Sequence, residues 1–150
     1  MKVLLATDGS KFSEAATQTI ISQCRPEATE VKVLNVVDLP LLIPTLYAAE
    51  FRQESLKHGE EIVHQAEKPL AKAGYKVETT VEEGDPKATI VQNAARWHAD
   101  LIVLGSHGRK GVDRFLMGSV SDAVARHAPC SVQVVRLPAN GHKQKGVAFE

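Results

Sequence analysis

Apolar and polar positions along the chain predict five strands separated by helical stretches. The strand-like runs are rich in leucine and β-branched residues and cover residues 2–6, 31–37, 76–81, 101–104 and 131–135. The first and fourth runs are continuously apolar, as in central parallel strands that are covered on both faces, whereas the run 76–81 alternates and indicates an edge strand. Because strands and helices alternate, the pattern predicts a single α/β domain with a parallel sheet.

Turn and cap residues mark the expected ends of the first two helices. The first should begin near Ser10 or Ser13, either of which can cap free backbone amides, and it should end before Pro26. The second should end at Gly74, and Pro69 inside it should kink or shorten it. Its apolar stripe consists of Phe51, Ser55, Ile62, Ala66, Leu70 and Ala73.

The third and fourth helices have clear start signals. Pro86 suits the first turn of the third helix, and Asp85 before it can act as the cap. The fourth should open at Ser119, which has the spacing of a capping box with Asp122 in place of the commoner Glu. Pro129 should stop this helix before the last strand.

Length and charge restrict the class of protein. The 150 residues suit one domain, expected at 1–137, followed by a polar flexible tail at 138–150; alternatively, that tail is a partner-binding arm or an added sequence. Eighteen basic side chains balance eighteen acidic ones, which argues against nucleic acid or a membrane as partner. The amino-terminal apolar run is too short for a signal peptide or a membrane span, and the two distant cysteines suit a reducing compartment. We therefore expect a cytoplasmic protein.

The segment between the fourth strand and the fourth helix has the composition of an anion-binding loop. In parallel α/β sheets, ligands bind beyond the carboxyl ends of strands, and a helix amino terminus offers free amides to phosphate. Gly105 and Gly108 can take positive φ and let backbone amides approach an anion without a Cβ in the way. Ser119 and Ser121 add hydroxyl donors, and the stretch 109–114 has a local excess of two positive charges. Each of these residues alone could serve only a turn or a cap, but together they predict an anion site.

The spacing Gly105-x2-Gly108-x9-Gly118-Ser119 resembles the nucleotide loop of universal stress proteins that bind ATP. The similarity extends from VLLATDGS near the start to CSVQVV in the last strand. It implies a doubly wound, five-stranded, flavodoxin-like or Rossmann-like α/β sheet of the adenine nucleotide alpha hydrolase type, in the order 3-2-1-4-5. It also implies ATP, with Mg²⁺ or Mn²⁺ held mainly through the phosphates, and a homodimer formed through residues 131–136.

The resemblance also carries over ligand-binding residues, one position at a time. In such proteins the equivalents of Asp8 and Val37 lie at the adenosine end, and the glycine and serine positions hold phosphates; Arg109 matches the pattern less closely. The implied nucleotide-binding residues are Thr7, Asp8, Val37, Gly105, Gly108, Arg109, Gly118, Ser119, Val120 and Ser121.

Simple chemistry supports part of this assignment and leaves alternatives open. A carboxylate just past a central strand can accept hydrogen bonds from ribose hydroxyls but would repel a polyphosphate, which suits Asp8 at the ribose; alternatively, Asp8 caps the first helix. The proline-containing segment 38–46 either covers the adenine with Leu39, Leu42 and Ile43 or packs on the second helix.

The expected role is regulatory, with an adenine nucleotide tuning an unidentified partner in a stress response. His107 lies in the loop, but no neighbouring acid or cysteine completes a nucleophile pair, so no dedicated catalytic residue is predicted. The phosphate-binding motif GxxxxGK[ST] is absent, and the histidine spacings predict no protein metal site. Two alternatives remain: a slow ATP-hydrolysing enzyme, and a nucleotide-free dimerisation module of the same family.

Overall fold

The computed structural model describes residues 1–40, 45–108 and 117–137. In this part of the chain five parallel strands form one sheet in the order β3-β2-β1-β4-β5, which confirms the predicted fold class and topology. The strands are β1 (Lys2–Ala6), β2 (Glu30–Val37), β3 (Lys76–Glu83), β4 (Leu101–Gly105) and β5 (Ser131–Val135). The α-helices are α1 (Lys11–Gln23), α2 (Ala48–Lys72), α3 (Pro86–Trp97) and α4 (Ser119–His127), and a short 3₁₀ helix covers Pro26–Ala28.

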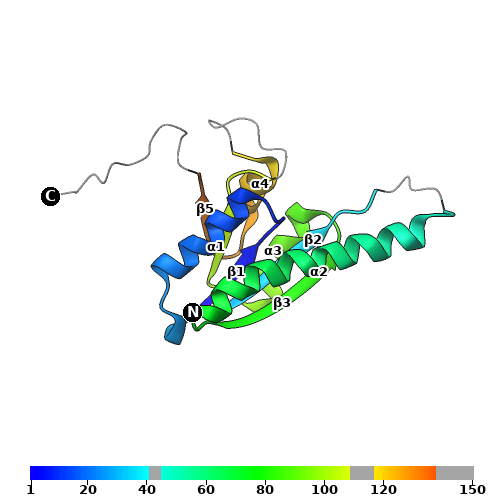
Figure 1. Ribbon diagram of the computed structural model, residues 1–150. Coiled ribbons are helices and arrows are strands. Elements are labelled where there is room, and N and C mark those ends of the chain that lie inside the picture. Colours follow the sequence, from blue (N-terminus) through cyan, green and yellow to red (C-terminus); the bar gives the residue numbers. More distant parts are fainter. Residues whose placement is uncertain (41–44, 109–116, 138–150) are drawn as a thin grey trace.

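Two apolar cores lie on opposite faces of this sheet (Figure 1). Side chains of β1 alternate between them: Leu5 packs under α1 and α2, and Leu4 packs under α3 and α4. Because β1 and β4 contribute to both cores, their sequences are apolar without alternation, as predicted. The sheet therefore has a covered centre, and its two edges are β3 and β5.

Helix α2 is longer than the sheet that it covers. Its buried positions run from Gly59 to Leu70, and the helix continues through Pro69 to Lys72. Of the two effects predicted for this proline, a kink or a shorter helix, the shorter helix is therefore wrong. Phe51, predicted on the buried stripe, is 43 % exposed, and Leu46 and Tyr47 before it are 83 % and 59 % exposed. The reason is length: the amino-terminal end of α2 extends past the sheet (Figure 1).

Close packing places α2 directly over β2 and β3. A Cβ atom on Gly59 would lie only 2.8 Å from both Asn35 Oδ1 and Val81 Cγ1. Only glycine allows the helix backbone to approach so closely.

The helix caps match the predictions at α1 and α3 but not at α4. Ser10 caps α1 by accepting a hydrogen bond from the amide of Ser13, and Asp85 caps α3. At α4 the cap position belongs to Gly118, which has no side chain, and the predicted capping box of Ser119 is wrong. Asp122 instead pairs with Arg126 one turn later, at 3.1 Å.

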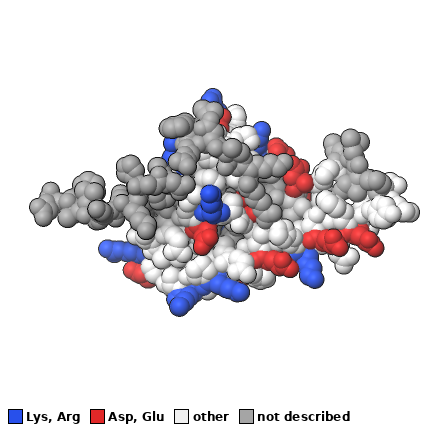
Figure 2. Space-filling view, turned by 45° about the horizontal axis from the view of Figure 1, so that its top comes forward, with Lys and Arg blue, Asp and Glu red and all other residues white. Residues whose placement is uncertain are grey.

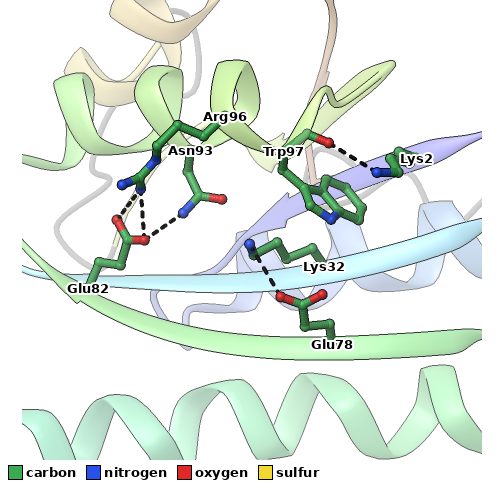
Figure 3. Close-up of polar contacts among 7 residues, drawn as sticks. All are labelled: Lys2, Lys32, Glu78, Glu82, Asn93, Arg96 and Trp97. Carbon is green, nitrogen blue, oxygen red and sulfur yellow. Dashed lines mark hydrogen bonds and ion pairs between the residues drawn. The ribbon is translucent and has the colours of Figure 1, made fainter.

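Polar side chains link α3 to strands β1, β2 and β3 (Figure 3). Glu82 of β3 accepts hydrogen bonds from Asn93 and Arg96 of α3, at 2.8 and 2.9 Å. Nearer the amino end of the sheet, the ammonium groups of Lys2 and Lys32 lie over the Trp97 ring. The Glu82 contacts therefore lie near the carboxyl end of β3, and the lysine contacts lie near the amino ends of β1 and β2. No helix within the described ranges is long and apolar enough to cross a membrane.

Candidate functional site

The loops after β1 and β4 lie side by side at the carboxyl edge of the sheet. The two strands are neighbours, and Ala6 at the end of β1 is in register with Leu104 near the end of β4. From this edge, α1 packs on one face of the sheet and α4 on the other. Such a switch point leaves a crevice in which open α/β sheets bind their ligands.

Asp8, in the loop after β1, has a fixed carboxylate. Its Oδ1 accepts hydrogen bonds from the amide of Ser10, at 2.9 Å, and from the hydroxyl of Ser13, at 3.2 Å. Its Oδ2 lies beside the second loop, 3.0 Å from the position that a Cβ on Gly108 would occupy. The fold thus brings together Asp8 and Gly108, two of the predicted residues, which are 100 positions apart in the sequence.

Gly105 at the end of β4 is required by packing rather than by a positive φ. A Cβ there would lie 2.6 Å from Phe12 Cβ and 2.7 Å from the Phe12 carbonyl carbon, so glycine lets α1 rest directly on the end of β4. Neither Gly105 nor Gly108 uses the positive φ that is open to glycine, because within the described residues only Gly9, Gly74 and Gly84 among the glycines have one. The glycines of this loop provide space, not an unusual backbone conformation.

Ser106, which the sequence analysis did not single out, closes the loop between β4 and α4. Its carbonyl oxygen accepts a hydrogen bond from the amide of Gly118, at 2.7 Å, and one from the hydroxyl of Ser121, at 2.9 Å. Its own amide donates to the carbonyl of Val135 in β5, at 2.8 Å. The Ser121 hydroxyl therefore points into the protein, and the backbone amide of Ser121 is the group left for a ligand.

The amino end of α4 offers several free backbone donors. Gly118 provides no side-chain cap, and the first backbone bond of the helix runs from the amide of Asp122 to the carbonyl of Gly118. The amides of Ser119, Val120 and Ser121 precede it and have no partner within the helix. Ser119 is exposed and Val120 is partly buried. This end of α4 can therefore bind an anion through its amides and the helix dipole.

His107 lies in the same loop with one ring nitrogen engaged and the other without a partner. Nδ1 lies 3.0 Å from the Ser106 hydroxyl, and the ring packs against Phe12 with centroids 5.3 Å apart. Nε2 is buried and has no hydrogen-bond partner in the described part of the chain. Leaving a buried polar atom unpaired is costly, so Nε2 is a group that a ligand or a water molecule could satisfy.

Thr7 and Val37 lie at the same edge but mainly serve the fold. The Thr7 hydroxyl accepts a hydrogen bond from the amide of Gly9, at 3.2 Å, and its carbonyl accepts one from the side chain of Asn35, at 2.9 Å. Val37 ends β2, one strand away, and its side chain faces Gly59 of α2. The buried side-chain amide of Asn35 thus joins β2 to the loop after β1. A polar residue inside an otherwise apolar part of a strand is the sequence feature that could have indicated this role.

Charge around this edge is mixed. On the face drawn in Figure 2, acidic and basic side chains are interspersed, without one large patch of either sign among the residues drawn in colour. Arg109 and the positive charges predicted next to it lie outside the described residues. Within the described residues, no group of three or more histidine, cysteine or acidic side chains is placed to hold a metal ion.

Comparison with known proteins identifies the family. Residues 1–136 match the universal stress protein family. A universal stress protein relative from Staphylococcus aureus (strain USA300) is 36 % identical over 148 residues, which cover 95 % of this chain and 89 % of the relative. One from Staphylococcus epidermidis is 38 % identical over 137 residues, covering 89 % and 82 %.

Solved structures give the same result. The protein MJ0577 superimposes with a TM-score of 0.82 at 28 % identity, covering 91 % of this chain and 96 % of its own. UspA from Lactobacillus plantarum gives 0.81 at 27 % identity, covering 91 % and 97 %. Two more distant structures share the fold, a universal stress protein in complex with cAMP and an Arabidopsis thaliana family member with AMP bound, with TM-scores of 0.69 and 0.71 at 24 % and 19 % identity. The chain belongs to the universal stress protein family.

Proposed function

We propose that this chain binds an adenine nucleotide at the carboxyl edge between β1 and β4, and that the bound state regulates a partner in a stress response. The observation that carries the proposal is the amino end of α4, which has no side-chain cap. It is held next to the loop after β4 by the hydrogen bond from the amide of Gly118 to the carbonyl of Ser106. Free amides at a helix terminus suit phosphates. Adenine nucleotides in two structures that share the fold support the ligand class.

The proposed ligand is ATP, with Mg²⁺ or Mn²⁺ held mainly through its phosphates. Gly108, Gly118 and the first amides of α4 surround the phosphates, and His107 Nε2 is available to them. Asp8 and Val37 lie at the adenosine end, where a carboxylate can accept hydrogen bonds from ribose hydroxyls. We place the protein in the cytoplasm, where this nucleotide pool is found.

One experiment separates this function from its alternatives. Protein purified without added nucleotide is denatured, the released ligand is identified by mass spectrometry, and the rate of ATP hydrolysis is measured on the reloaded protein. An adenine nucleotide with negligible turnover supports a binding protein. Steady turnover would assign slow hydrolysis instead, and failure to bind any adenine ligand in a calorimetric titration would leave only a dimerisation module.

Asp8→Ala is expected to weaken adenosine and ATP binding alike, by about tenfold or more, because a charged acceptor facing the ribose is lost. Calorimetric titration with both ligands, with and without Mg²⁺, measures this. Asp8→Asn is the matched control for folding, since its amide oxygen can still accept from the amide of Ser10. A loss that is confined to ATP and depends on Mg²⁺ would place Asp8 at the metal and contradict the ribose assignment.

We also propose a homodimer through the outer edge of β5. The carbonyl of Val135 accepts a hydrogen bond from the amide of Ser106, the residue after β4, so the backbone groups of Val134 point away from the sheet and have no neighbouring strand among the described residues. Because the Val134 side chain packs on the core, a charge there would disturb folding as well as pairing.

Val134→Pro removes the outward amide without breaking the bonds to β4, and is expected to give a monomer in sedimentation velocity at micromolar concentration. Val134→Ala loses the same side-chain packing but keeps the amide, so it should remain a dimer. If the folded proline variant sediments like the parent protein, the interface lies elsewhere.

A further inference from the structure

Helices α1 and α2 cover the same face of the sheet (Figure 1). A groove lies between them, lined by side chains of both. Its volume is about 320 Å³, at the lower end of the range for small-molecule sites. It exists because the facing side chains are small: Ser13 and Thr17 on α1 oppose Ala66 on α2. The helices rest on the same core but leave space between them above it.

The groove is rich in hydrogen-bond acceptors and carries a negative charge. The hydroxyl proton of Thr17 is donated to the carbonyl of Ser13, at 3.1 Å, which leaves the Thr17 oxygen as an acceptor. Glu14 is the one charged residue among the described residues that line the groove, and it is exposed at the surface. An anion would be repelled here, and a cation would be attracted.

Pro69 adds an acceptor that an ordinary helix would not have. Proline has no amide hydrogen, so the carbonyl oxygen of Gln65, four residues earlier in α2, lacks its helical donor. Gln65 and Pro69 both line the groove. Ile62 and Ala66 from the same helix, both largely buried, give the groove an apolar wall.

We propose that this groove binds a small organic cation, a primary ammonium group on a short aliphatic stem. An ammonium group has three donors, which suit the Glu14 carboxylate, the freed Gln65 carbonyl and the Thr17 hydroxyl oxygen. The aliphatic stem packs against Ile62 and Ala66. One end of the groove reaches the loop after β1, where Thr7, Gly9 and Ser10 line it. The groups proposed to hold the cation all lie on α1 and α2, and the test uses no nucleotide, so the proposal stands apart from the proposed nucleotide function.

The test uses n-butylammonium as probe in an NMR titration of the ¹⁵N-labelled full chain. Saturable shifts are expected at the amides of Thr17, Gln65 and their neighbours in the groove. 1-Butanol, which has the same stem without the charge, and butyrate, which has the opposite charge, should each bind at least about tenfold more weakly.

Two variants and one control complete the test. Glu14→Gln should weaken butylammonium binding by about tenfold, whereas Glu54→Gln, which removes the same charge from an exposed position of α2 outside the groove, should not change it. Pro69→Ala restores a donor to the Gln65 carbonyl and should weaken binding roughly fivefold. Because this change also favours the helix, such a loss cannot be ascribed to unfolding. Equal binding of butanol and butylammonium, or unchanged binding in Glu14→Gln, would overturn the proposal.

Discussion

Gly118→Val is expected to abolish ATP binding while the protein stays folded. The φ of Gly118 is −62°, so valine causes no backbone strain there. Its Cβ, however, would lie 2.9 Å from the Ser106 carbonyl oxygen and 3.2 Å from His107 Cα. These are backbone atoms that cannot swing aside, so the bond between Gly118 and Ser106 should open and the first turn of α4 should move. Calorimetric titration should show affinity reduced by at least about a hundredfold.

Ser119→Ala is the companion variant. Ser119 is exposed and makes no cap, so the free energy of unfolding should change by less than about 0.5 kcal/mol. Loss of one hydroxyl contact to a phosphate should still lower ATP affinity by about tenfold. Circular dichroism and urea unfolding establish that both variants are folded. Parent-like affinity in folded Gly118→Val would remove the phosphates from this loop, and with them the main support for nucleotide binding.

Gly105→Ala is expected to have the largest effect on stability. The added methyl group would collide with Cβ and the carbonyl carbon of Phe12, so either α1 or the end of β4 must shift. Overpacking of this kind costs about 1 to 3 kcal/mol of the free energy of unfolding. For a chain of this length, the melting temperature should fall by roughly 2 to 4 °C for each kcal/mol.

Gly108→Ala is the matched control for that substitution. There, among the described residues, the added Cβ would meet only the Asp8 side chain, at 3.0 Å, and Gly108 is exposed. Urea unfolding of the two alanine variants should therefore show a clear loss at position 105 and a small one at 108. Equal unfolding free energies would mean that α1 does not rest on the end of β4.

The sheet could be predicted from sequence because each strand carries its own signal. Apolar runs of β-branched residues marked β1 and β5 at their observed bounds, and the alternating run that became β3 lies at an edge as predicted. The exposure of Phe51 could not be foreseen in this way. Periodicity shows which side of a helix is apolar, but not how far the sheet beneath it extends.

The cap of α4 and the role of Gly105 could not be predicted, because both depend on contacts between residues that lie far apart in the sequence. Gly118, not Ser119, occupies the N-cap position of α4, and its amide is bonded to Ser106. Gly105 is fixed by Phe12, which lies 93 positions earlier in the chain. The partners of Asn35 and Ser121 lie 28 and 15 residues away. The sequence thus indicated where the candidate site lies, whereas the fold decides which of its polar groups are free.

The bond between Ser106 and Gly118 has a consequence for how this protein family can diversify. This hydrogen bond holds Ser106 and Gly118 together, so the positions of β4 and α4 do not depend on the number of residues between them. Closing a longer loop costs little, about 0.6 kcal/mol for a doubling of its length. An insertion or deletion between these two residues is therefore expected to leave β4 and α4 in place, so that it would alter ligand recognition while the framework stays unchanged.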